Sequence, residues 1–198
     1  MALRKAILRS SLALAAFGMA SGANAATFIV DAAANSSSGG TPLASIFLNA
    51  GDSFTVSSSL NDLWNAGSLP RWSDGNGLVG PRFASALDDS GEAPGTQIGQ
   101  LFTPLWTQNG HTSAYGSLVG EIGGVYQTLG ANFSGPAWGT GTLNLSYWDS
   151  NSGDNTGSIA FAIGAVPEPA TWLSMILGFG LVGGALRRRR QQGAARFA

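Results

Sequence analysis

Residues 141–163, GTLNLSYWDSNSGDNTGSIAFAI, contain the two clearest strand patterns of the chain. Leu143, Leu145 and Tyr147 alternate with Asn144, Ser146 and Trp148, and further on Ile159, Phe161 and Ile163 alternate with Ala160 and Ala162. Alternation with a period of two is typical of a strand with one buried face. The stretch therefore predicts two strands joined by the polar loop 149–157.

Shorter runs of the same kind occur elsewhere, at 28–30, 52–58 and 118–122, with turn-forming residues at 74–77 and 134–136. Short strands separated by Gly and Pro favour an all-β fold. We predict an antiparallel β-sandwich over 49–165, preceded by an N-terminal strand and linker over 26–48.

The charges are segregated along the chain of 198 residues. Between residues 26 and 166 the basic residues are Arg71 and Arg82, against ten carboxylates, so this segment carries a formal charge of −8. A strongly acidic body argues against nucleic acid as a partner, because binding to phosphates requires Lys and Arg. The absence of Cys excludes disulfides and thiolate chemistry.

The first 25 residues have the three parts of a secretory signal peptide. Arg4, Lys5 and Arg9 are basic, residues 11–20 are apolar, and Ala23-Asn24-Ala25 is a small-x-small cleavage sequence. We expect a signal helix that the general secretion machinery recognises, with cleavage between Ala25 and Ala26.

The C-terminal end combines a proline motif, an apolar segment and a basic cluster. Pro167-Glu168-Pro169 precedes 17 uncharged residues, 170–186, and four arginines follow at 187–190. A helix of that length covers about 25 Å, close to the thickness of a hydrocarbon core. Arginines favour the cytoplasmic side. The pattern predicts a single transmembrane helix with an exported body and a short tail, 191–198.

These C-terminal residues resemble the PEP-CTERM sorting signal in its Trp-containing variant. The matching residues are Pro167, Glu168, Pro169, Trp172, Arg187, Arg188, Arg189 and Arg190, with Met175-Ile176, Gly178-Phe179-Gly180 and Gly183-Gly184 between them. The resemblance implies a sorting signal over 166–190 that is recognised by an exosortase. It further implies a precursor anchored in the inner membrane and a mature form in the cell envelope or the exopolysaccharide matrix.

The loop 149–157 is rich in oxygen donors. Asp149, Asn151, Asp154 and Asn155 are candidate metal ligands, and Ca²⁺ prefers such hard oxygens. The loop is not an EF-hand, because Ala160 stands where the twelfth-position Glu would be required. The alternative is an ordinary solvated turn, since Asp, Asn, Ser and Gly are also the usual turn residues.

Several segments resemble the calcium-dependent galactophilic lectins, which are small bacterial β-sandwiches. The similar segments are 50–56, 116–123, 141–149 and 154–158. The resemblance implies that Asp149 contacts both calcium and sugar, and that Asp154 and Asn155 correspond to a pair of asparagines. The chain departs from the family in its shorter loop, in the Asp at 154 and in lacking the family's His-Pro-x-Gln sugar contact.

Two tryptophans are candidates for stacking against a sugar ring. Trp148 directly precedes Asp149, and Trp72 precedes the turn at 74–77. The alternative for both is ordinary packing.

The sequence thus predicts an exported envelope or matrix protein whose body binds carbohydrate, with calcium as a cofactor. The alternative is a structural or adhesion protein of the envelope without a specific ligand. We do not expect an enzyme. A Ser-His-Asp triad would require His111, and no Gly-x-Ser-x-Gly sequence is present. The expected partners are the exosortase, the secretion machinery, the membrane and a polysaccharide.

Overall fold

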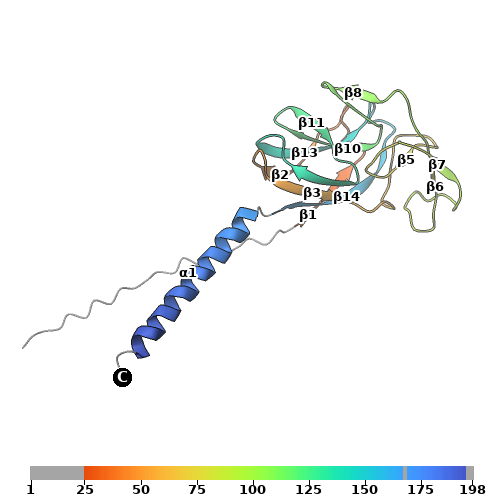
Figure 1. Ribbon diagram of the computed structural model, residues 1–198. Coiled ribbons are helices and arrows are strands. Elements are labelled where there is room, and N and C mark those ends of the chain that lie inside the picture. Colours follow the sequence, from red (N-terminus) through yellow and green to blue (C-terminus); the bar gives the residue numbers. More distant parts are fainter. Residues whose placement is uncertain (1–24, 167–168, 195–198) are drawn as a thin grey trace, which may run out of the picture.

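A computed structural model of the chain describes residues 25–166 and 169–194 (Figure 1). Almost all of the predicted signal peptide, Pro167 and Glu168 of the sorting motif, and the last four residues lie outside this part. In chain order the elements are β1 (Ala25–Asp31), β2 (Leu43–Leu48), β3 (Ser53–Ser57), β4 (Trp64–Asn65), β5 (Trp72–Ser73), β6 (Arg82–Phe83), β7 (Gln97–Gly99), β8 (Trp106–Gln108), β9 (His111–Ser113), β10 (Ser117–Ile122), β11 (Val125–Thr128), β12 (Asn132–Pro136), β13 (Gly141–Trp148), β14 (Thr156–Ala165) and α1 (Pro169–Ala194).

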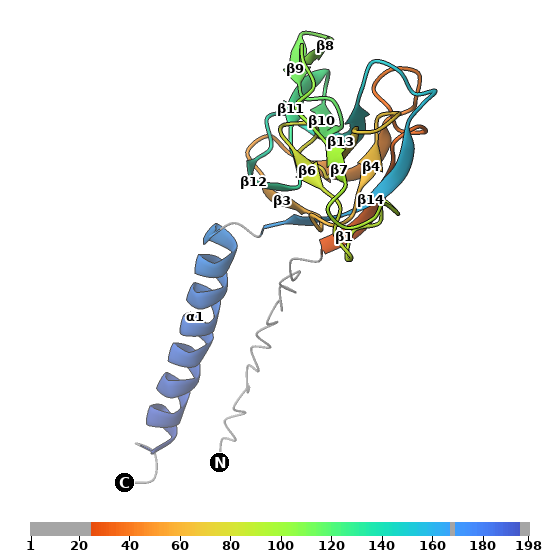
Figure 2. The ribbon, with the colours of Figure 1, turned by 90° about the vertical axis from the view of Figure 1, so that its right-hand side faces the viewer.

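The body is built from two antiparallel sheets. The six-stranded sheet has the order β12-β3-β14-β4-β5, with β1 paired to β14, and the four-stranded sheet has the order β11-β10-β13-β2. Two small hairpins, β6–β7 and β8–β9, are attached to them (Figures 1 and 2). The prediction of an all-β, antiparallel sandwich is confirmed.

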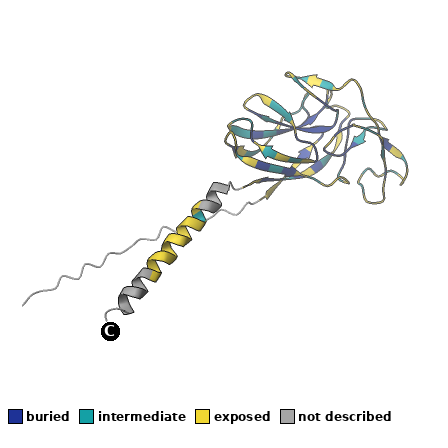
Figure 3. Cartoon of the chain, in the orientation of Figure 1, coloured by how far each residue is buried: buried dark blue, intermediate teal, exposed yellow. Residues whose placement is uncertain are grey.

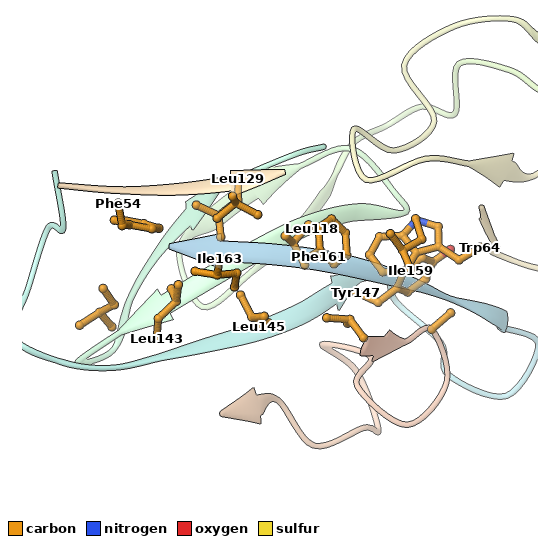
Figure 4. Packing of buried hydrophobic residues seen from close by; sticks show 14 of the residues in the cluster. Phe54, Trp64, Leu118, Leu129, Leu143, Leu145, Tyr147, Ile159, Phe161 and Ile163 are labelled. Atoms are coloured by element: carbon orange, nitrogen blue, oxygen red, sulfur yellow. The ribbon is translucent and has the colours of Figure 1, made fainter. Parts of the chain in front are cut away.

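The core lies between the sheets and is formed by the alternating residues of the sequence. Leu143, Leu145 and Tyr147 of β13 and Ile159, Phe161 and Ile163 of β14 are all fully buried. Figure 4 shows these side chains meeting those of β3 and β10, and Figure 3 shows the buried residues gathered along the facing strands. The ring of Trp64 packs edge-on against Tyr147, with centroids 4.6 Å apart. Burial of these apolar surfaces is the main source of the stability of the body.

The two N-terminal strands, β1 and β2, each belong to one of the two main sheets. β1 pairs with β14 in continuous register from Ala25–Gly164 to Asp31–Ser158. β2 pairs with β13 in the other sheet. Residues 26–48, which the sequence analysis set apart as strand and linker, thus contribute one strand to each layer, and β1 begins one residue earlier, at Ala25.

β14 connects the two ends of the body. Its ten residues span about 30 Å at the usual strand rise. It begins at Thr156, beside the loop 149–155, and ends at Ala165, two residues before the sorting motif. The loop and the C-terminal signal therefore lie at opposite ends of the same strand (Figure 1).

The helix predicted over 170–186 is present as part of α1, and its described side chains are almost all exposed (Figure 3). Over the described residues, no helix has both the length and the apolar character needed to cross a membrane. The predicted transmembrane span is thus not found in this part of the chain.

Candidate functional site

The loop between β13 and β14, residues 149–155, is called the acidic loop below. It is folded back on itself by hydrogen bonds between its own polar groups. The amide of Ser150 donates to Oδ1 of Asp149 at 2.7 Å. The side-chain amide of Asn151 donates to Oδ1 of Asp154 at 2.8 Å, and Oδ1 of Asn151 accepts from the amide of Gly153 at 3.0 Å. These bonds fix the conformation of the short loop that carries the carboxylates of Asp149 and Asp154.

A segment far away in sequence supports this loop from behind. The hydroxyl of Ser37 donates to the carbonyl of Asp149 at 2.9 Å and accepts from its amide at 3.1 Å. Asn155 donates from Nδ2 to the carbonyl of Ala32 at 3.1 Å. The loop after β1 therefore fixes both ends of the acidic loop.

An open pocket of about 320 Å³ lies in front of the acidic loop. Its lining residues come from four separate segments and are Ala66, Arg71, Leu78, Phe102, Tyr115, Asp149, Ser150, Asn151 and Asp154. The rings of Phe102 and Tyr115 meet edge-on, with centroids 5.0 Å apart. The pocket is thus lined by the carboxylates of Asp149 and Asp154, called its acidic wall below, and also by aromatic rings.

The electrostatics of the acidic wall are unusual for a solvated turn. Asp149 is only 4% exposed. Burial raises its pKa to about 6, assisted by the charge of Asp154 and opposed by hydrogen bonds from the Ser150 amide and the Asn155 side chain. The negative charge of an ionised Asp149 is therefore poorly stabilised by its surroundings, and a cation bound at this wall would stabilise it.

Two buried oxygens next to the acidic wall have no hydrogen-bond partner among the described residues. They are Oδ1 of Asn155 and the hydroxyl of Tyr147. Burial and the charges of Asp149 and Asp154 raise the pKa of the Tyr147 hydroxyl well above its usual value. A buried polar atom without a partner is costly, so such atoms often mark a ligand or an ordered water.

Three of the four predicted metal ligands, Asp149, Asn151 and Asp154, line this pocket, and Asn155 lies buried behind them. Arg71, Phe102 and Tyr115 are site residues that the sequence analysis missed. The one available signal was the scarcity of basic residues in the body. Within the described parts of the chain, no three His, Cys, Asp or Glu side chains form a cluster.

The two tryptophans nominated for sugar stacking lie elsewhere. Trp148 is fully buried, donates from Nε1 to the carbonyl of Trp106 at 3.0 Å and packs edge-on against His111, with centroids 5.3 Å apart. Burial leaves no ring face open to a sugar, so we omit Trp148 from the site. Trp72 packs against the small cluster of Leu63, Ala84 and Ile98 and lines a second hollow of about 120 Å³.

The hydrogen bond of the His111 ring is with a hydroxyl and not with a carboxylate of the kind that a triad needs. Its Nε2 is 3.0 Å from Oγ1 of Thr128, and burial lowers its pKa. The ring projects from β9 of the β8–β9 hairpin and packs against Trp148 on the outer side of β13.

Comparison with known proteins identifies the C-terminal segment. Residues 165–190 match the PEP-CTERM protein-sorting motif. The predicted sorting signal is confirmed: it indicates an exported protein whose membrane-anchored precursor is processed by an exosortase. No curated protein matches the chain significantly.

Among solved structures, the chain is similar to one described as "EclA N-terminal domain; PllA-like lectin". The alignment covers 71% of this chain and 95% of that one, with 21% sequence identity and a TM-score of 0.42.

Proposed function

We propose that the exported body binds carbohydrate in the pocket in front of the acidic loop, and that a calcium ion bridges the protein and the sugar. The observation that carries the proposal is the convergence of Asp149, Asn151 and Asp154 at one wall of an open pocket, with the unpartnered, buried Oδ1 of Asn155 in the residue that follows them. An ordinary solvated turn would leave its carboxylates in water, whereas Asp149 is buried.

The donor set suits calcium. Ca²⁺ takes six to eight oxygen ligands, drawn from carboxylates, amide or backbone carbonyls and water. Asp149, Asp154 and Asn155 would supply side-chain oxygens, with Asn151 as a further amide oxygen. The ion would neutralise the repulsion between the two carboxylates and satisfy the amide oxygen that now lacks a partner.

The rest of the pocket suits a sugar. Hydroxyl groups of a pyranose can complete the oxygen shell of a bound calcium ion, and the rings of Phe102 and Tyr115 provide apolar surface for the carbon skeleton. A pocket of this size accommodates one or two sugar rings rather than a long polymer chain.

The position of the pocket suits an anchored precursor. The acidic loop precedes Thr156 at one end of β14, and the sorting motif follows Ala165 at the other end. A body tethered through its C-terminal signal would therefore present the pocket away from the tether. After cleavage near Pro167-Glu168-Pro169, the mature protein would carry the pocket into the envelope or the exopolysaccharide matrix.

A glycan array tests this function directly. The precursor, purified in detergent, is applied with calcium and with a chelator. We expect binding only with calcium, and loss of binding in Asp149→Asn. The matched control is Glu92→Gln, which also removes one carboxylate but lies on the loop between β6 and β7. A blank array from folded protein would instead favour a structural or adhesion protein without a specific ligand.

A further inference from the structure

Among the described residues, Arg71 is the one basic side chain that lines the pocket. The body contains two basic residues, Arg71 and Arg82, against ten carboxylates over residues 26–166. Because the body has so few basic residues, the position of one of them at the ligand pocket indicates which charge the ligand carries.

The two arginines differ in how many hydrogen bonds their guanidinium groups donate to the protein. Arg82 donates from Nη1 to Oδ2 of Asp74 at 2.9 Å and from Nη2 to the carbonyl of Leu60. The guanidinium of Arg71, by contrast, makes one hydrogen bond within the described residues, from Nη1 to the carbonyl of Ala66 at 3.2 Å. Most of its five N–H donors remain available to the pocket.

Arg71 is nevertheless held in place. Its guanidinium lies over the ring of Phe102, 4.8 Å from the centroid, and its side chain is 35% exposed. The nearest carboxylate oxygen, Oδ2 of Asp154, is 3.9 Å away, which is beyond hydrogen-bonding distance. A partly exposed pair at that distance contributes little to stability, so neutralising Asp154 is a weak reason for the position of Arg71.

The charge balance of the pocket changes sign when calcium binds. Asp149, Asp154 and Arg71 together carry a formal charge of −1, which a divalent cation converts to +1. A neutral sugar leaves that charge uncompensated, whereas a ligand with one carboxylate cancels it. The planar fork of Arg also matches a carboxylate better than it matches a single hydroxyl.

We propose that the pocket selects a hexuronate, a sugar that carries a carboxylate, with this carboxylate against the guanidinium of Arg71 and the hydroxyls at the calcium ion. This inference rests on the proposed function and specifies its ligand class. It also makes uronate binding dependent on calcium, because without the ion Asp149 and Asp154 repel the ligand.

The test compares matched sugars that differ only at carbon 6. The detergent-purified full chain is titrated calorimetrically, in millimolar calcium, with the methyl glycosides of galactose and galacturonate, glucose and glucuronate, and mannose and mannuronate. We expect at least one uronate to bind about tenfold or more tightly than its hexose, as charge-assisted hydrogen bonds imply. Arg71→Gln should reduce that ratio to about one, and Arg71→Lys should retain part of it.

The outcomes separate the two proposals. Equal affinities within every pair, or an Arg71→Gln variant that weakens hexose and uronate alike, would overturn the uronate inference and leave the calcium-dependent sugar site intact. No binding of any of the six sugars by folded protein would overturn both. Thermal melting of each variant shows whether it is folded.

Discussion

Tyr147 and Trp148 are consecutive on β13, yet their rings are buried on opposite faces of the sheet. Tyr147 packs against Trp64 in the core, and Trp148 packs against His111 beneath the β8–β9 hairpin. β13 is therefore covered on both faces where it leads into the acidic loop. This double burial fixes the start of the loop and the position of Asp149.

Substitutions of Trp148 should therefore affect stability rather than ligand contacts. Trp148→Ala should lower the free energy of unfolding by about 3–5 kcal/mol because it leaves a large cavity. Trp148→Phe should cost about 1–2 kcal/mol, since the carbonyl of Trp106 loses its donor. Urea unfolding measures both values. A Trp148→Phe variant of unchanged stability that no longer binds sugar would show that the indole contacts the ligand after all.

The strands could be predicted from sequence because their signal is local. The alternation in 143–147 and in 159–163 reflects which face of each strand is buried, and no knowledge of distant residues is needed to see it. The oxygen-rich loop was visible for the same reason, since its donors lie within seven residues.

The other half of the pocket could not be predicted in this way. Arg71, Phe102 and Tyr115 lie in three segments that only the sheet order brings to the acidic loop. The cover over Trp148 likewise comes from Trp106 and His111, about forty residues earlier in the chain. Strand patterns in one sequence specify neither which strands pair nor which loops cross a given face.

Gly67 lies so close to the carboxylate of Asp154 that a side chain at this position would clash with it. Its φ is +112°, and an added Cβ would lie 2.6 Å from Oδ2 of Asp154. Gly67→Ala should therefore displace that carboxylate and weaken calcium binding, besides a backbone cost of about 1 kcal/mol. Gly51→Ala is the matched control, because Gly51 has a φ of +92° and open space around its Cβ position. Equal calcium affinity in the two variants would argue against Asp154 as a ligand.

β1 should be essential to the exported body. It pairs along β14 over seven residues, and its Val30 is fully buried in the core. A chain that starts at Ala26 should fold, whereas deletion of residues 26–31 should abolish cooperative thermal unfolding. Circular dichroism distinguishes the two proteins. A cooperative transition in the shorter chain would mean that β14 tolerates a free edge.

Processing should depend on the proline motif. Replacement of Pro167, Glu168 and Pro169 by alanine should leave uncut precursor in the membrane fraction, because the proline part of the matched sorting motif is lost. Alanines at Gln191 and Gln192, outside the matched residues 165–190, serve as the control. Immunoblotting of membrane and exported fractions follows both variants. Normal cleavage of the first variant would contradict the sorting assignment.

The burial of Asp149 also predicts how stability depends on pH. Its pKa is raised from 3.8 to about 6, so without metal the folded state holds this proton more tightly than the unfolded state does. The contribution of this group to stability is thus complete below about pH 4 and is lost as the pH rises through about 6, a change on the order of 2–3 kcal/mol. Calcium requires the ionised carboxylate, so its affinity should fall steeply below about pH 6.

The central claim is that the acidic wall is a cation site, and thermal melting with calcium tests it most directly. At pH 7.5, Asp149→Asn should melt at a higher temperature than the native protein without metal, because the buried charge is gone. Calcium at 100 times its dissociation constant should then stabilise the native protein by about 2.7 kcal/mol and leave the variant unchanged. An unchanged melting temperature of the native protein in millimolar calcium would contradict the account.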